Sequence, residues 1–587
     1  GGRLFRNLGD RWLDVTERAG LSAPALQSAG ANAFQSVAAG DLDGDGDTDV
    51  LLRLSTGALR VWRNDGGNKL HSLRVRLEAQ QSNRTGAGTK VDVRAGSLRQ
   101  RFETSAAVPA AAPADILFGL GTRAAADVVR VLWPSGTVQA ELPQGAPTGT
   151  TPTVTVTELN RKPSSCPYLF TWNGTAFQFV TDFMGGGELG YWVAPGEHAS
   201  PDPDEYVRIG HDQLKVRDGR YDLRVTNELE EALFVDKLQL VAVDHPGGSE
   251  VFPNEGLKEH PLPPFALTTT RGAHAPAAAV DDHGHDMLSR LAEIDRTYPD
   301  NFTLIQPRGF AEPHSLTLDL GPDASRAVLL MTGWTDYAFS SDNVAGFQRG
   351  LSLRAPSLEA KDASGAWRTI VEDIGIPVGR PQTVVVDLRG KLGDARQVRV
   401  VTNMRIYWDQ ILVDTSDGNQ RTQVTRLDPD SADLHWRGFS AEVTPDGREP
   451  YLYDYSRVTP DSTWKVMPGR YTREGDVRPL LRAADDMFVV ARPGDEIALS
   501  FEAAALPALP DGWTRTFLLF ADGFSKEMDI NSSSPHEAAP LPFHAMTRYP
   551  YSGSEHYPRS ARHTDYLTRY NTRVVHSDLP PLDTTGR

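Results

Sequence analysis

Five aspartates crowd into the segment DLDGDGDTDV, residues 41–50, where no lysine or arginine is interleaved to relieve their repulsion. A hard divalent cation is the simplest relief. Calcium takes about six to eight oxygen ligands, and calcium loops supply them from alternate positions with a glycine at the sixth, which is Gly46 here. The spacing therefore predicts a calcium site with the ligands Asp41, Asp43, Asp45, Asp47 and Asp49. The alternative is a solvated acidic turn without metal.

This acidic segment does not continue as an EF-hand. An EF-hand needs a bidentate glutamate at the twelfth loop position, and that position is Leu52, inside the apolar run VLLRL. We therefore expect a β-strand after the loop.

A second set of residues mixes aromatic rings with carboxylates in the segments GWTDYAFSSDN and IYWDQ. Sugar binding needs this mixture, because rings stack on the C–H face of a sugar while planar polar groups hold its hydroxyls. Two distant carboxylates can also flank a glycosidic bond. The alternative is a pair of core tryptophans with polar residues at strand ends. The candidate ligand-binding residues are Trp334, Asp336, Tyr337, Asp342, Tyr407, Trp408 and Asp409.

Imidazoles and carboxylates also gather in the segment HAPAAAVDDHGHD, residues 274–286. Such side chains hold zinc or another transition metal. The alternative is an exposed polar loop, which the neighbouring proline and alanines favour. The residues concerned are His274, Asp281, Asp282, His283, His285 and Asp286.

Composition and missing motifs narrow the function classes. The net charge of −17 argues against nucleic acid as a partner. The single cysteine, Cys166, excludes an intramolecular disulfide. No apolar stretch approaches the roughly 18–20 residues of a membrane span. No G-x-S-x-G, H-E-x-x-H, Walker or C-x-x-C-H motif occurs, and we expect no enzymatic activity.

The elements that would position these residues are strands. Runs such as YDLRVTNEL and VRVVTNMRIYW alternate with period two, and 52 glycines and 41 prolines supply many turns. The 587 residues suggest roughly three to five domains, so we expect an all-β chain of several domains.

Residues 1–66 resemble FG-GAP (VCBS-type) repeats, whose blades build β-propellers, on the segment AFQSVAAGDLDGDGDTDVLLRLSTGALRVWRNDGG. Only about one and a half units are present, while a propeller needs four or more blades. The chain also opens abruptly at GGRLFRNLGD without a visible signal peptide. We therefore expect further sequence upstream, or another chain, to complete the blades.

Residues 67–142 resemble the ASPIC/UnbV domain, on the segments NRTGAGTKV, FGLG and WPSGTVQ. From residue 166 onward, segments such as CPYLFTWNGTAFQFVTDF and PLPFHAMTRYPY resemble a module that follows these domains in bacterial proteins, acidobacterial ones included. The whole chain thus resembles a bacterial, cartilage-acidic-protein-like family. This resemblance implies secretion.

The remaining boundaries follow from composition. Residues 143–163 are rich in proline and threonine and read as a linker with one strand. Residues 164–260 and 419–540 read as separate β-domains. Residues 261–300 read as a connector with a short helix at 287–294. Residues 301–418 weakly resemble a galactose-binding-like jelly roll, and residues 541–587 read as an extended tail.

Together these observations predict a secreted or cell-surface calcium-binding protein with a structural or adhesive role, assembled with other protein chains. The alternative is an extracellular carbohydrate-binding protein with glycans as ligands. A polysaccharide-active hydrolase is the third class, but no catalytic motif in the sequence indicates it.

Overall fold

The computed structural model describes most of the chain. The described residues are 3–7, 11–19, 34–79, 82–105, 115–134, 138–143, 150–158, 166–258, 262–300, 302–305, 307–416, 420–460 and 466–576.

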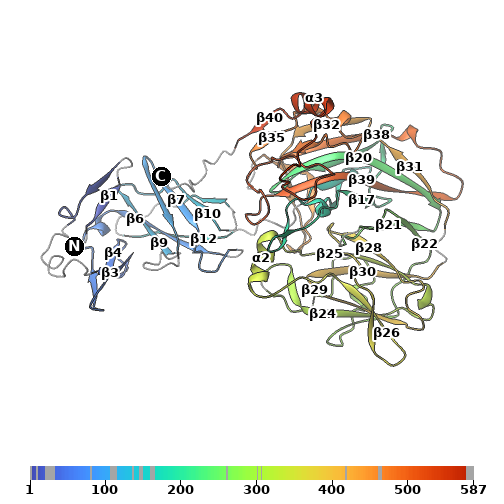
Figure 1. Cartoon of the computed structure of the whole chain (residues 1–587), viewed down its shortest axis with the longest axis horizontal. Helices are drawn as coiled ribbons and strands as arrows, with labels where there is room; N and C mark the ends of the chain where they lie inside the picture. The colour runs from blue at the N-terminus through green and yellow to red at the C-terminus, as the bar shows by residue number, and fades with distance from the viewer. Residues whose placement is uncertain are drawn as a thin grey trace. The chain divides into compact units, whose positions relative to one another are not determined.

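The chain divides into two compact units, residues 1–161 (unit 1) and 162–587 (unit 2) (Figure 1). Strands dominate both units, and the described residues add two short α-helices, α2 (Ser340–Gln348) and α3 (Ala561–Arg569). The predicted all-β class is therefore confirmed. No helix among the described residues is long and apolar enough to cross a membrane.

Unit 1 begins with two small antiparallel sheets. The strands β1 (Phe5–Asn7) and β2 (Trp12–Asp14) form a pair. The strands β3 (Phe34–Gly40), β4 (Asp49–Leu54) and β5 (Leu59–Trp62) form a meander, and the acidic segment joins β3 to β4. The strand expected after the loop is therefore present.

The rest of unit 1 packs two sheets around one apolar core that draws side chains from both. One sheet has the order β11-β10-β7-β8 and the other β12-β6-β9. Their strands are β6 (His71–Glu78), β7 (Lys90–Ala95), β8 (Leu98–Glu103), β9 (Asp115–Gly121), β10 (Val128–Leu132), β11 (Val138–Glu141) and β12 (Thr153–Thr157). Because β12 pairs parallel with β6, residues 150–158 belong to this domain, not to a linker.

Unit 2 contains an outer sandwich built from residues 166–258 and 420–576, whose nine-stranded and five-stranded sheets enclose the largest apolar core. The nine strands are β13 (Tyr168–Trp172), β14 (Phe177–Asp182), β18 (Val216–Arg217), β19 (Arg220–Thr226), β32 (Ser431–Trp436), β33 (Phe439–Glu442), β34 (Tyr453–Thr459), β36 (Gly475–Asp476) and β38 (Asp495–Glu502). The five are β17 (Asp204–Ile209), β20 (Glu231–Pro246), β31 (Gln423–Leu427), β37 (Val489–Ala491) and β39 (Trp513–Glu527).

An inserted sandwich, residues 274–416, interrupts the outer one between β20 and β31 and has a core of its own. Its first sheet contains β23 (Ala278–Asp281), β24 (Phe310–Asp319), β26 (Ser357–Lys361), β27 (Trp367–Val371) and β29 (Gln397–Met404). Its second sheet contains β25 (Val328–Thr335), β28 (Gln382–Asp387) and β30 (Ile406–Asp414). Shorter pairs are β15 (Trp192–Ala194) with β16 (Glu197–His198), β21 (Glu250–Pro253) with β22 (Leu267–Thr270), and β35 (Gly469–Tyr471) with β40 (Arg573–Val575).

This topology corrects three expected boundaries. The regions 164–260 and 419–540 are not separate domains, because β20 pairs with β39 along most of its length. The region 261–300 is more than a connector, since β23 pairs with β24 and the buried Leu291 joins the inserted core. Its expected helix is a single 3-10 turn, Leu288–Arg290.

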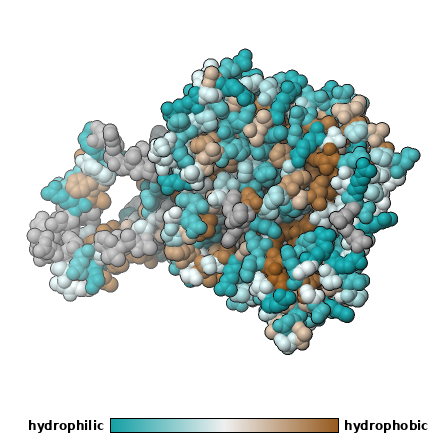
Figure 2. Space-filling view, turned by 45° about the vertical axis from the view of Figure 1, so that its right-hand side comes forward, coloured by the Kyte–Doolittle hydropathy of each residue, from teal (hydrophilic) through white to brown (hydrophobic). Residues whose placement is uncertain are grey.

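The C-terminal tail is also more than an extended arm. It carries α3 and β40, and Tyr566 of α3, which is 2% exposed, packs into the core of the outer sandwich. The last part of the expected tail, residues 577–587, lies outside the described residues. Polar side chains predominate on the face of the molecule drawn in Figure 2, with apolar side chains gathered into smaller patches.

Candidate functional site

The acidic loop, residues 41–49, winds around the carboxylate of Asp41. The backbone N–H groups of Gly44, Asp45 and Gly46 all donate to its two oxygens, at 2.8–3.1 Å. Gly46 has a φ of 89°, a left-handed conformation that glycine adopts without steric cost. The turn that brings the aspartates together is therefore built into the backbone.

Three carboxylates converge in this loop. One oxygen each of Asp41, Asp43 and Asp45 lies within 4.8 Å of the others. Besides backbone N–H groups, their side-chain partners are Arg74 of β6, at 2.5 Å from Asp41, Arg63, at 3.8 Å from Asp43, and the amide of Asn68, which donates to Asp45 at 2.7 Å. A hard cation that prefers carboxylate oxygens suits this set.

The other two aspartates of the loop, Asp47 and Asp49, accept hydrogen bonds from the backbone. Both oxygens of Asp49 accept backbone N–H groups, from Leu42 at 2.9 Å and Asn64 at 2.8 Å, and these bonds lower its pKa. Asp47 is 5% exposed, and burial raises its pKa. Its Oδ2 accepts the N–H of Asn68, while its Oδ1 has no hydrogen-bond partner among the described residues. The converging set thus contains three of the five expected carboxylates.

The two tryptophans of the expected sugar site, Trp334 and Trp408, are buried and cannot stack on a sugar. Trp408 is 4% exposed and belongs to the core of the inserted sandwich. Trp334 is 5% exposed, because Tyr407 stacks on its ring at 4.5 Å and the guanidinium of Arg380 lies 4.6 Å from the ring centre. Their rings are already covered by protein, so the core alternative describes them.

The expected carboxylates and Tyr337 are engaged as well. Asp336 pairs with Arg308 at 2.5 Å and with Arg405 at 3.0 Å; burial opposes its ionisation, but these arginines hold its pKa below the usual range. Asp342 caps the first turn of α2 through a 3.0 Å bond to a backbone N–H. The hydroxyl of Tyr337 lies 3.9 Å from the buried thiol of the single cysteine.

Asp409 is 4% exposed and accepts the backbone N–H groups of Asp295 and Arg296, at 3.2 and 3.0 Å. Burial raises its pKa to about 6. This carboxyl fixes the chain before β24 to β30, and it does not meet the other residues of the expected sugar site in an open cleft.

The expected histidine–aspartate loop forms only in part. Asp281, Asp282 and His283 bring one ligand atom each within 4.8 Å, and His285 lies 2.9 Å from Asp281. His274 stands apart, paired through its backbone with Val413. The carboxylate of Asp281 accepts the backbone N–H groups of His283 and His285, so it closes the turn that follows β23. These contacts describe an exposed polar turn with a buried aspartate at its base, in which three ligand atoms keep a spacing that suits a metal.

A polar cavity of unit 2 was not visible in the sequence. It encloses about 70 Å³ and is lined by four carboxylates, those of Asp202, Asp204, Glu205 and Glu255. Among the described residues that line it, none is a lysine, arginine or histidine. The four carboxylates come from β17 and from two loops, so no sequence spacing links them.

Aromatic and amide groups complete this acidic cavity. The rings of Tyr206 and Phe265 stack at 3.7 Å, and the side-chain amide of Gln382 donates to Glu205 at 3.0 Å. Burial, together with the neighbouring carboxylates, raises the pKa of Glu205 to about 8 and the pKa of Glu255 well above its usual value. A pKa of about 8 favours the protonated form of Glu205 at neutral pH, and a protonated carboxyl group donates as well as accepts hydrogen bonds.

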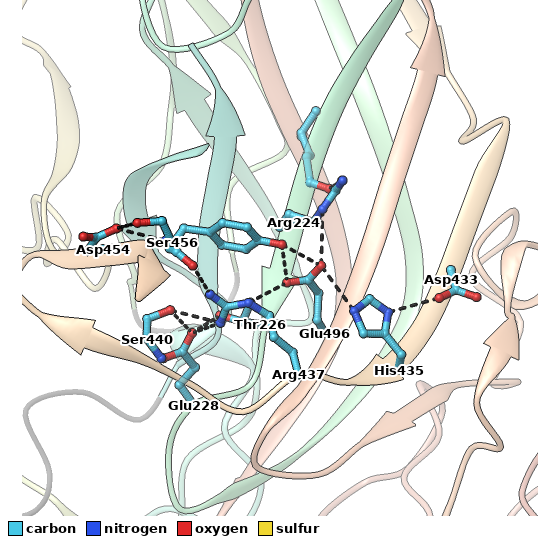
Figure 3. A network of polar contacts seen from close by, with 12 residues as sticks. Arg224, Thr226, Glu228, Asp433, His435, Arg437, Ser440, Asp454, Ser456 and Glu496 are labelled. Carbon is cyan, nitrogen blue, oxygen red and sulfur yellow. Dashed lines mark hydrogen bonds and ion pairs between the residues drawn. The ribbon is translucent and has the colours of Figure 1, made fainter. Parts of the chain in front are cut away.

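A second polar network lies on the nine-stranded sheet, on the side away from its core (Figure 3). Glu496, 1% exposed, accepts from the hydroxyl of Tyr455 at 2.9 Å. Arg224 and Arg437 each approach it at 3.2 Å, and His435 at 3.6 Å. These groups come from β19, β32, β34, β38 and the turn after β32.

Glu228 extends this network. It accepts the backbone N–H and the hydroxyl of Ser440, both at 2.6 Å, and the hydroxyl of Thr226 at 2.9 Å, while Arg437 lies between the two glutamates (Figure 3). Burial raises the pKa of both glutamates, against the effect of the arginines. The donors of the chain itself occupy both carboxylates, so this network ties strands together and offers no free acid.

Comparison with known proteins identifies one domain. Residues 79–160 match the family model described as "ASPIC and UnbV". The expected ASPIC/UnbV domain is thus confirmed, and the match extends to the strand β12 that the sequence assigned to a linker. No curated protein matches the chain. The alignment with a solved structure titled "Glycoside hydrolase" covers 66% of this chain and 85% of that one, at 11% identity; its TM-score of 0.12 does not indicate a shared fold.

Proposed function

We propose that this chain is a secreted or cell-surface calcium-binding protein that serves a structural or adhesive role with other protein chains. The observation that carries the proposal is the convergence of Asp41, Asp43 and Asp45 within 4.8 Å in a loop between two paired strands. In this proposal β3, β4 and β5 form a blade of the FG-GAP type, and the inserted sandwich is of the galactose-binding-like, jelly-roll type.

Calcium would act on the loop through charge. Arg74 and Arg63 are the basic side chains paired with its carboxylates among the described residues, and Arg63 lies 3.8 Å from Asp43. A bound dication offsets the remaining repulsion and fixes the loop between β3 and β4. It thereby rigidifies the sheet that a partner would contact.

Exposed apolar side chains on the first two sheets of unit 1 favour the proposal that other protein chains bind there. Trp12 is 66% exposed, Leu59 65% and Val61 57%. Leu59 and Val61 lie two residues apart on β5 and so share one face of that strand, and exposed apolar faces are typical of surfaces that bind another protein.

Calcium binding is tested by titrating the chelator-treated full chain in a calorimeter. We expect one site of the affinity of extracellular modules, with a dissociation constant of about 10⁻⁴–10⁻³ M, and a loss of about tenfold or more in Asp43→Asn. Asp65→Asn is the matched control, because Asp65 also pairs with Arg63 but is 70% exposed and lies outside the loop. No heat of binding at millimolar calcium, or equal binding in both variants, would contradict the site.

The acidic cavity favours carbohydrate binding as a second candidate function. It combines the half-buried ring of Phe265 with planar polar groups, the mixture that hydroxyl-rich ligands require. The raised pKa of Glu205 favours a protonated carboxyl group, which adds a donor to the acceptors of the cavity.

A glycan array tests this second candidate. We expect the affinity for a bound glycan to fall at least about tenfold in Phe265→Ala and in Glu205→Gln. The reason is that removing a stacking ring or a buried polar contact costs roughly 1–3 kcal/mol. Trp367→Ala is the control, since Trp367 is a half-buried ring on β27 outside the cavity. An array without any specific glycan, or equal loss in the control, would reject this function.

A further inference from the structure

Four side chains from distant parts of the sequence meet beside the strands β20 and β39 of the outer sandwich. His544 lies between three aspartates: its Nδ1 is 2.7 Å from Asp486 and 3.7 Å from Asp236, and its Nε2 is 2.9 Å from Asp522. One ligand atom each of Asp236, Asp522 and His544 lies within 4.8 Å of the other two. We call these four residues the His544 cluster.

The backbone places each member of the cluster. Asp236 occupies a bulge of β20, where the register with β39 shifts between Val235 and Lys237. Bulges re-aim side chains in this way. Asp522 stands on β39, opposite Lys237. Asp486 adopts a φ of 65°, a left-handed conformation that is uncommon outside glycine.

The buried member of the cluster is incompletely satisfied. Asp236 is 0% exposed; its Oδ2 accepts the backbone N–H of Asp486 at 2.8 Å, but its Oδ1 has no hydrogen-bond partner among the described residues. A buried carboxylate oxygen without a partner costs free energy. The side chain of Asp236 therefore has the capacity for one more partner.

The charges of the cluster do not balance. Three carboxylates face one imidazole, and two more carboxylates lie nearby, those of Asp204 and Asp485. Arg562 pairs with Asp485 at 2.5 Å on the outside. The rings of Phe488 and Phe524 pack against His544, with centroids at 6.2 and 5.2 Å.

We propose that the His544 cluster binds a first-row divalent transition cation, with Asp236, Asp522 and His544 as ligands and Asp486 as a fourth ligand or as the carboxylate that orients the imidazole. Imidazole together with carboxylates is the ligand set of zinc, manganese and iron sites. The cation takes the place of the imidazole proton, on the side of the ring where Oδ2 of Asp236 lies 3.7 Å from Nδ1. The side chain of His544 is 29% exposed, which leaves a path for entry.

The site does not rest on the proposed calcium function, because it lies in unit 2 and the acidic loop in unit 1. Metal binding would join β20, β39, the loop before β37 and the C-terminal segment that carries α3. A cation that binds only the folded chain stabilises it by mass action. We therefore expect zinc to raise the melting temperature of the full chain.

Cobalt(II) titration of the chelator-treated full chain, followed by visible absorption, tests the proposal. We expect one equivalent with d–d absorption, displaced by zinc, and lost in His544→Gln and in the isosteric Asp236→Asn. His283→Gln and His435→Gln are the matched controls, because each removes an imidazole beside an aspartate at 3.0 Å elsewhere in unit 2. Both controls should retain the equivalent.

Three results would overturn the site. They are no cobalt binding near neutral pH, binding that persists in a folded Asp236→Asn chain, and binding that disappears in His283→Gln. If either ligand variant fails to fold, the readout is the melting temperature of the unmodified chain with zinc. A melting temperature that zinc does not raise would count equally against the proposal.

Discussion

We expect the substitution Glu449→Gln to lower the free energy of unfolding by about 3 kcal/mol, because it removes the ion-pair partner of a buried arginine. Glu449 belongs to the outer sandwich and pairs at 2.5 Å with Arg380 and at 3.1 Å with Arg308, both of the inserted sandwich. Arg380 is 3% exposed, and Glu449 is its ion-pair partner among the described residues. The glutamine side chain has the same shape as the glutamate and keeps one acceptor oxygen, but it lacks the negative charge that pairs with Arg380.

Urea unfolding of the full chain, followed by tryptophan fluorescence, measures this loss. Asp387→Asn is the control, because Asp387 pairs with Arg389 at 2.6 Å but both side chains are more than 40% exposed. Exposed ion pairs contribute about 0–1 kcal/mol. Equal effects of the two substitutions would show that the junction between the sandwiches does not depend on the buried pair.

The double variant Arg380→Met/Glu449→Gln separates charge from packing. With the arginine gone, no uncompensated cation remains at this position, and replacing both members of a buried pair is often neutral. We therefore expect the double variant to recover most of the stability lost in Glu449→Gln. A double variant less stable than either single one would assign the effect to lost packing, since Arg380 also covers the ring of Trp334.

The sequence predicts local structure well where the signal is local. The spacing of Asp41, Asp43 and Asp45 with Gly46 correctly indicates a tight loop between two strands, because ligand spacing and glycine placement act within one turn. The same residues do not reveal Arg74, which reaches Asp41 from β6. Which carboxylates converge depends on that neighbouring strand.

The sandwiches of unit 2 could not be delimited from the sequence. Alternation with period two identifies β20 and β39 as strands, but it contains no information on which strands pair. Their pairing joins residues 231–246 to residues 513–527 across the whole inserted sandwich. The His544 cluster and the acidic cavity were missed for the same reason, since each takes its side chains from segments far apart in the sequence.

The aromatic-carboxylate segments show the opposite problem. Tyr407 and Trp408 are adjacent in the sequence and lie on one strand, β30, so their side chains point to opposite faces. One face is the core of the inserted sandwich, which takes Trp408. Composition alone does not distinguish an exposed aromatic side chain that binds a sugar from a buried one that packs in a core.

This distinction has a measurable consequence at Trp408. We expect Trp408→Ala to lower the free energy of unfolding by about 3–5 kcal/mol, the cost of removing a large aromatic side chain from a packed core. The indole packs against Gly333 of β25 so closely that an added Cβ at Gly333 would lie 3.0 Å from its ring. Neighbouring strands cannot collapse into the space without breaking the pairing of β25 with β30.

Thermal and urea unfolding of Trp408→Ala and Trp436→Ala give the comparison. Trp436 is 38% exposed at the end of β32, and its loss should cost about 1 kcal/mol or less. A sugar-stacking Trp408 would behave in the reverse way, with unchanged stability and weakened glycan binding. Since the ring of Trp408 is 4% exposed, that outcome would require β30 to leave the core, and it would refute the packing of the inserted sandwich described above.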